Sequence, residues 1–262
     1  VLYQDFEGEI EAPIPVTEGA VSAADAAYVS EKLAAAKKPL IFAGGGRWTP
    51  ESARAIEKFA EINQIPVVHD FRASDRISFS SPANAGWLGY GRNDHAAELL
   101  SEADVLLEVG ALLTDVPSDG YTLRQDTHVE NIVVNIDTGL RGHSGAISRH
   151  ILASPVALAE ALDNINTGEI SSAQSEWFKN ARRAHQEFST IPSESDWRAT
   201  SAGTAHMEAV IKALQDQLPE EAIFTFGAGN HCIWAQQFLP TQHYPSQPVS
   251  YTHLRAHETR ED

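Results

Sequence analysis

The sequence predicts an α/β fold in which helices cover both faces of a parallel sheet. Short apolar runs typical of buried strands recur along residues 20–165, and segments with helical periodicity separate them. Several of these runs end at glycine or aspartate, residues that suit a turn out of a strand. Strands that alternate with helices at this pace need crossover connections, so the sheet is expected to be parallel and buried on both sides.

The first strand lies in the stretch KPLIFAGGGR at residues 38–47, where a four-residue apolar run ends in three glycines. Thr49 and Pro50 follow with the pattern of a helix N-cap and a first helical position. Glycines at such a turn permit positive φ and let a ligand approach the backbone N–H groups. Two interpretations remain open, a nucleotide-binding turn or a tight connection, because Thr49 stands where a dinucleotide fingerprint has its third glycine. The candidate binding residues of this turn are Gly44, Gly45 and Gly46.

The other elements of this domain follow in order along the chain. Caps and periodicity predict helices at residues 23–36, 50–62, 93–100 and 154–162, and strands at 40–43, 64–68, 104–109, 131–136 and 151–152. Residues 70–91 are rich in serine, asparagine and glycine and are expected to be irregular. Together the elements describe a Rossmann-like domain over residues 20–165, whose ligands would bind at the carboxyl ends of the strands. Asp137 follows a strand there, either as a ribose ligand or as a solvated loop residue.

The rest of the chain divides into four predicted segments. Residues 1–19 carry prolines among acidic residues and are expected to be a linker from a preceding N-terminal domain. Residues 166–203 are polar and are expected to be a connector with a helix at 172–188. Residues 204–248 would begin a second, truncated α/β domain, with a helix, a strand at 222–226, the turn GAGNH and another helix. Residues 249–262 lack apolar periodicity and are expected to be a non-native tail, so the chain is interpreted as a fragment.

Composition argues against several classes of function. Nineteen Lys and Arg residues against 36 Asp and Glu residues give a formal net charge of −17, which opposes binding to nucleic acid or anionic membranes. The single cysteine, Cys232, excludes an internal disulfide, and no spacing typical of a zinc site is present, so no metal ligand is predicted. A reducing, cytoplasmic location and no membrane-spanning segment are therefore expected.

Two separate stretches carry a resemblance to a known family. The first holds the passages KPLIFAGGG, AEINQIPVV, ADVLLEVGALLTD and VVNID, which resemble the central domain of thiamine-diphosphate-dependent enzymes of the acetolactate synthase group. The passage LPEEAIFTFGAGNHCIWAQQF resembles the opening of their diphosphate-binding domain, and it is the more specific because order, spacing and the preceding Leu-Pro all match. The resemblance covers about residues 20–247.

This resemblance implies a cofactor and a site. Thiamine diphosphate would bind together with Mg²⁺, and the residues beside its diphosphate would be Gly227, Gly229, Asn230 and His231. Some family members also bind FAD in the central domain, so the glycine turn at 44–46 and Asp137 would form either an FAD cleft or its vestige. No catalytic residue is expected in this chain. The activating glutamate of the family belongs to a preceding domain, and the magnesium-binding motif to a later stretch.

The implied activity is the decarboxylation or carboligation of a 2-keto acid by a lyase or transferase that forms homodimers or homotetramers at full length. The chain alone is expected to be inactive. One alternative is an independent FAD- or NAD-binding module that would use the glycine turn and Asp137 without His231. Another, an α/β hydrolase with Ser144 as nucleophile, fails because Ser144 lies in a loop and not directly between a strand and a helix. His143 has no partner at ligand spacing and is assigned no role.

Overall fold

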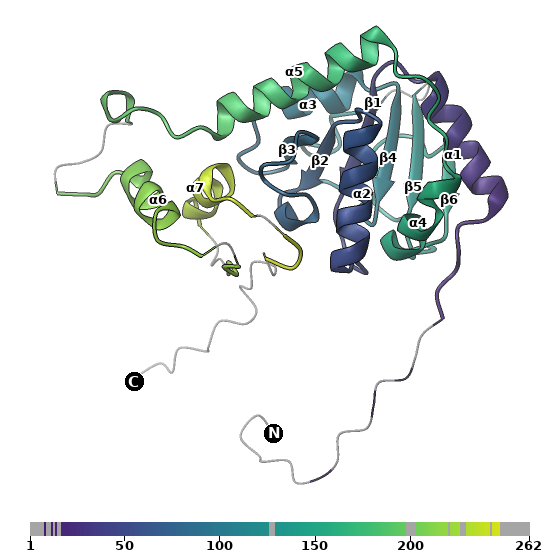
Figure 1. Cartoon of the computed structure of the whole chain (residues 1–262), viewed down its shortest axis with the longest axis horizontal. Helices are drawn as coiled ribbons and strands as arrows, with labels where there is room; N and C mark the ends of the chain where they lie inside the picture. The colour runs from purple at the N-terminus through teal and green to yellow at the C-terminus, as the bar shows by residue number, and fades with distance from the viewer. Residues whose placement is uncertain are drawn as a thin grey trace.

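The computed structural model describes residues 17–125, 129–197, 203–219, 221–225, 229–241 and 243–246, together with residues 8, 12 and 14. Most of this part of the chain forms one parallel sheet with helices on its two faces (Figure 1). The predicted α/β class is therefore confirmed. The predicted tail at 249–262 and most of the predicted linker lie outside the described residues.

Six strands form the sheet, in the order β3-β2-β1-β4-β5-β6, and all neighbours are parallel. The strands are β1 (Pro39–Ala43), β2 (Val67–Asp70), β3 (Asn84–Leu88), β4 (Val105–Val109), β5 (Glu130–Val134) and β6 (Arg149–Ile151). The first strand, β1, lies in the middle of the sheet. The next two strands, β2 and β3, extend the sheet to one side, and β4 then pairs with β1 on its other side. The carboxyl ends of β1 and β4 therefore flank the switch point, where open sheets of this order bind ligands.

Alternate side chains along each strand enter different cores. Ile41 and Ala43 point to the face covered by α1 (Ala23–Ala35), α2 (Pro50–Ile62) and α4 (Pro155–Ala161). Leu40 and Phe42 point to the opposite face, which is covered by α3 (Asp94–Glu102) and α5 (Ser172–Ser189) (Figure 1). This alternation follows from the two-residue period of a strand, and it requires apolar residues at successive positions.

Local sequence sets where the helices begin. Ser22, Thr49, Asn93 and Ser154 each accept a hydrogen bond from a backbone N–H of the following first turn, as N-caps do. The remaining elements are α6 (Met207–Gln215), α7 (His231–Phe238) and the 3₁₀ helices η1 (Ser74–Arg76), η2 (Leu162–Asn164) and η3 (Glu194–Asp196). Among the described residues, no helix combines the length and the apolar character needed to cross a membrane.

Two sequence expectations about strands were wrong. Residues 70–91 were expected to be irregular, but Asn84–Leu88 forms edge strand β3, whose polar and glycine residues conceal the apolar pattern. Residues 222–225 were expected to belong to a strand, but they form none in the structure. Within the described chain, Phe224 donates one backbone hydrogen bond, to Ser246. A strand needs a row of such bonds with a neighbour, so an apolar run alone is insufficient.

Two buried histidines lie beside the sheet, His69 on β2 and His185 on α5. His185 of α5 packs edge-on against Phe79, with ring centroids 5.8 Å apart, and its Nε2 atom is buried without a partner. His69 of β2 lies 6.4 Å from the ring of Trp87 and uses Nδ1 in a 2.9 Å contact with the carbonyl of Asp70. Burial lowers the pKa of both imidazoles to about 4, so both are neutral near pH 7.

We expect these two histidines to make the fold sensitive to acid. In the unfolded chain they bind protons near pH 6.5, but in the folded chain only near pH 4, so the unfolded state carries more protons between these values. The free energy of unfolding should therefore fall by roughly 2 kcal/mol per histidine between pH 7 and pH 5. Urea unfolding of the native chain and of His185→Phe should show a smaller pH slope in the variant. The variant Ser101→Ala, at an exposed position of α3, should keep the native slope, and equal slopes in all three proteins would contradict the prediction.

Candidate functional site

The predicted glycine turn lies at the switch point, as the sequence indicated, but its backbone is packed against the turn that follows β4. Gly44 donates a 3.1 Å backbone hydrogen bond to Val109, and a Cβ atom added to Gly45 would lie 1.9 Å from the carbonyl oxygen of Gly110. Gly45 has φ +62°, which favours glycine. A Cβ atom added to Gly44 would lie 3.0 Å from the Cβ of Asp70 and 3.2 Å from that of Ala111, so packing accounts for glycine at both positions.

Trp48 closes the same turn from the side of α2. Its Nε1 donates a 2.7 Å hydrogen bond to the carbonyl of Gly44, and its side chain is buried. At the start of α2, the Thr49 and Ser52 side chains form a reciprocal capping box, which uses donors that an anion would otherwise receive. The turn and the helix behind it are thus satisfied within the protein, and nucleotide binding here stays a prediction.

Asp137 lies two strands away from β1, after β5, and is exposed. Its carboxylate accepts a 2.8 Å hydrogen bond from the N–H of Gly139, and its own N–H donates to the side chain of Asn135. This geometry is that of a local turn stabilised by an aspartate side chain. The role of Asp137 as a ribose ligand remains untested.

The second glycine turn differs from the first at its helix start. Gly229, Asn230 and His231 are exposed, whereas Gly227 lies outside the described residues. Asn230 is the N-cap of α7, but its side chain makes no capping hydrogen bond. The His231 ring leans back over Gly229, because a Cβ there would lie 2.8 Å from Nδ1. An exposed helix start without a side-chain cap, with an imidazole beside it, suits an anionic group such as a diphosphate.

Sequence reasoning missed a buried pair between β4 and the loop after β5. The Glu108 side chain is 0% exposed and the His143 side chain 3%, and His143 Nε2 lies 2.5 Å from Glu108 Oε1. The other carboxylate oxygen accepts a 3.0 Å hydrogen bond from the N–H of Leu113, and His143 Nδ1 lies 3.2 Å from the carbonyl of Gly145. A glutamate inside an apolar strand is the signal that could have prompted a search for a partner, since buried carboxylates need one.

The two acceptors around His143 favour a charged imidazole. Burial by itself would lower the pKa of His143, but the hydrogen bond and Coulomb attraction from Glu108 outweigh burial and raise it above its usual value. Ser144 continues the same contact, because its N–H donates to the carbonyl of Leu113 at 2.7 Å and its hydroxyl donates to Leu123 at 2.9 Å. The loop is thereby tied to the end of β4. Ser144 serves this structural role, which agrees with rejecting it as a nucleophile.

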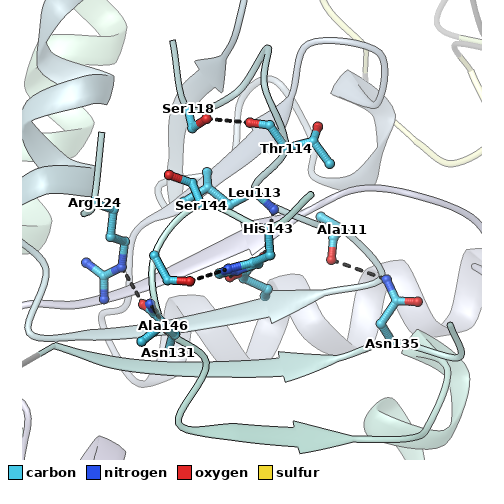
Figure 2. Close-up of polar contacts among 12 residues, drawn as sticks. Ala111, Leu113, Thr114, Ser118, Arg124, Asn131, Asn135, His143, Ser144 and Ala146 are labelled. Atoms are coloured by element: carbon cyan, nitrogen blue, oxygen red, sulfur yellow. Dashed lines mark hydrogen bonds and ion pairs between the residues drawn. The ribbon is translucent and has the colours of Figure 1, made fainter. Parts of the chain in front are cut away.

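A buried arginine completes this network on the side of α3. Arg124 donates to the carbonyls of Leu100 and Ala103, each at 2.9 Å, and thus binds one carbonyl of the last turn of α3 and that of its C-cap residue. Its Nε donates to the side chain of Asn131 on β5 (Figure 2). The residues in Figure 2 therefore hold loops in place, and within the described part of the chain no group of three or more His, Cys, Asp or Glu residues could hold a metal ion.

A cavity of about 540 Å³ opens at the carboxyl edge beyond β3 and β4. Its lining comes from the turn after β3 and the loop after β4, and comprises Gly89, Tyr90, Gly91, Arg92, Asp115, Val116, Asp119 and Gly120. The Tyr90 side chain is exposed, and Arg92 forms ion pairs with Asp94 and Asp119. Ile233 of α7 packs against Gly91, so the cavity borders the helix that carries the second glycine turn.

The fold and this edge define a class of protein: a doubly wound α/β domain followed by an exposed helix start without a side-chain cap. Residues 26–162 match the family model for the thiamine pyrophosphate enzyme central domain. The match spans more than half of the chain, and the chain belongs to this family. The resemblance seen in the sequence is confirmed at the level of the family, while a specific relation to acetolactate synthase remains a prediction.

The chain is similar to two kinds of curated enzyme. It is 28% identical over 216 residues to a sulfoacetaldehyde acetyltransferase of Rhodobacter capsulatus, an alignment that covers 76% of this chain and 37% of that protein. It is 27% identical over 239 residues to a 3D-(3,5/4)-trihydroxycyclohexane-1,2-dione hydrolase of Bacillus cereus, covering 81% and 37% respectively. The chain therefore spans little more than a third of the length of these relatives.

We expect Gly45→Ala to destabilise the fold. The new Cβ would overlap the carbonyl oxygen of Gly110 and would hold an L side chain at φ +62°, so the free energy of unfolding should fall by roughly 3 kcal/mol. Gly46→Ala is the matched control, because a Cβ at Gly46 meets nothing within 4 Å. Its cost should stay within about 1 kcal/mol. Urea unfolding compares the two, and equal costs would show that residue 45 is not constrained by packing.

We also expect the imidazole of His143 to titrate above pH 6.5, because the Glu108 carboxylate stabilises its charged form. The stabilising contribution of this pair should thus be complete at pH values below 6.5 and disappear as the pH rises through the elevated pKa. Titration of the His143 ring protons by NMR measures this value directly. Glu108→Gln should lower it, whereas Glu98→Gln, which removes an exposed carboxylate beside His95, should leave it unchanged. A native value at or below 6.5 would refute the assignment.

Proposed function

We propose that this chain is part of a thiamine-diphosphate-dependent enzyme that decarboxylates a 2-keto acid or transfers the resulting acyl unit, as acetolactate synthase-like enzymes do. The observation that carries the proposal is the exposed start of α7, which has no side-chain cap and lies within the G-x-G-N-H sequence. Membership of the family supports the same cofactor, and Mg²⁺ usually accompanies it. The two kinds of relative are named as an acetyltransferase and a hydrolase, so the molecule that accepts the acyl unit stays open in this proposal.

Each residue of the half-site has a defined task in this proposal. Backbone N–H groups at the start of α7 and the His231 ring would donate hydrogen bonds to the diphosphate oxygens. Gly229 leaves space for close approach, since it has no side chain between the turn and the ring of His231. The positive end of the α7 dipole would add attraction for the anion. Thiamine diphosphate, when bound, supplies the nucleophilic carbon and the electron sink that 2-keto acid chemistry requires.

The cavity of about 540 Å³ beside α7 supports a small polar substrate close to this half-site. Arg92 offers a guanidinium for a carboxylate, and Asp115 offers a carboxylate for hydroxyl groups. The resemblance also supports a homodimer or homotetramer of the complete protein and a cytoplasmic location, both of which we propose. FAD has no comparable support, because the turn at Gly44 and Gly45 is closed by packing.

We expect thiamine diphosphate with Mg²⁺ to bind the half-site, and His231→Ala to weaken binding by about tenfold, the value of one charge-assisted hydrogen bond. Calorimetric titration of the complete gene product measures both affinities, with His95→Ala on α3 as a control that should bind normally. FAD is titrated in parallel. Binding of FAD that Gly46→Val abolishes and His231→Ala does not affect would favour the independent nucleotide-binding module and count against the proposal, and a Cβ at Gly46 meets nothing within 4 Å.

A further inference from the structure

The short helix η1, which follows β2, carries two adjacent charged residues that are almost completely buried. Asp75 is 2% exposed and Arg76 is 9% exposed, and the two side chains form an ion pair. Arg76 Nη2 also donates a 2.9 Å hydrogen bond to the carbonyl of Gly45. Charges removed from water in this way must be matched closely by partners, because an unpaired buried charge is costly.

The segment that follows α7 supplies further partners for η1. The N–H of Ser246 donates to Asp75 Oδ2 at 3.0 Å, and Ser246 is itself buried. The hydroxyl of Thr241 donates to the carbonyl of Ser74 at 3.3 Å, and the N–H of Phe79 donates to the carbonyl of Thr241 at 2.7 Å. These bonds join residues more than 160 positions apart in the sequence, so they attach the second part of the chain to the first.

Arg76 is also placed between two aromatic rings from different parts of the chain. Its guanidinium carbon lies 4.7 Å from the ring centre of Tyr244 and 5.9 Å from that of Trp48. Trp48 is fixed to the first glycine turn through its hydrogen bond to Gly44. The guanidinium thus connects that turn with the segment after α7 by cation–π contacts and by its hydrogen bond.

Other contacts of α7 with the central domain are of a different kind. Ile233 packs against Gly91, and the Gln237 amide donates a 2.7 Å hydrogen bond to the carbonyl of Phe188. Apolar packing and a single neutral hydrogen bond tolerate small displacements. A buried ion pair with its hydrogen bonds tolerates them poorly, because a displaced partner leaves a charge without compensation.

We infer that Asp75 and Arg76 are positioning residues that hold α7 in one orientation against the central sheet. With α7 they position the diphosphate half-site at Gly229 to His231, and this part of the inference rests on the proposed function. The docking of α7 does not rest on it. The pair and its neighbour Ser74 act through their contacts with Thr241, Tyr244 and Ser246.

The single native cysteine allows a direct test of this orientation. Spin labels on Cys232 of α7 and on Ser101→Cys, an exposed position of α3, report the distance between the helix and the central domain by electron–electron double resonance. The labelled chain should give one narrow distance distribution. The double variant Asp75→Asn, Arg76→Met removes both charges without isolating either, and it should broaden the distribution or shift it. Arg72→Met, which removes an exposed arginine from the same loop, should leave it unchanged.

A second variant guards against a general loss of folding. Tyr244→Leu removes the aromatic partner of Arg76 from the C-terminal side only, and the near-ultraviolet circular dichroism of the central domain should stay native. Broadening of the distance distribution in this folded variant supports the inference. A native distance distribution in every folded variant at Asp75, Arg76 or Tyr244 overturns the inference. The labels report docking without any cofactor, so failure of thiamine diphosphate to bind would refute the proposed function and leave this result intact.

The complete gene product provides the functional readout of positioning. Tyr244→Leu should raise the dissociation constant of thiamine diphosphate by at least about fivefold, with kcat at saturating cofactor within about twofold of native. A raised dissociation constant with a nearly unchanged kcat is expected when the half-site is displaced but keeps its hydrogen-bond donors. Unchanged cofactor affinity in a variant with a broadened distance distribution would overturn the positioning role.

Discussion

Burial of the sheet on both faces is the constraint on which the rest of this structure depends. Strands in such a sheet have no solvent-facing side, so each polar group on them needs a partner inside the protein. Glu108 on β4 obtains its partners from the loop after β5, through His143, and from the N–H of Leu113. His69 on β2 is kept neutral and packs against Trp87. Loops at the carboxyl edge are therefore held in place by hydrogen bonds to buried polar side chains of the strands. The cavity lined by residues 89–92, 115–116 and 119–120 lies at the same edge.

The two glycine turns of the chain show how one sequence pattern leads to two roles. Both pass from an apolar run through glycines into a helix. At the first turn, the capping box of α2 and the contact between Gly45 and Gly110 satisfy the backbone within the protein. At the second, the start of α7 is exposed and Asn230 provides no side-chain cap. The N–H groups of Cys232 and Ile233 donate to the carbonyls of Gly229 and Asn230. No side chain caps the start of α7, and this difference from the first turn is the reason for proposing the second turn as the diphosphate site.

The contact at η1 gives the central domain a positioning part in the activity that we propose. A cofactor held at a helix start is only as well placed as the helix itself, and errors of about 1 Å at a reacting centre are costly. Asp75 and Arg76 join the first glycine turn, the end of β2 and the segment after α7 in one buried cluster. This cluster is a physical means by which the central domain can influence chemistry elsewhere in the protein.

The sequence by itself determined the fold class, the places where most helices begin and the family. These features depend on periodicity, caps and short motifs, all of which are local. It left the packing role of Gly45 open, and it missed strand β3, the Glu108–His143 pair and the Asp75–Arg76 cluster. Glu108 and His143 are 35 positions apart, and Asp75 and Ser246 are 171 apart. Only the tertiary structure decided these features, because each depends on which distant backbone or side chain lies within hydrogen-bond reach, and periodicity carries no information about that.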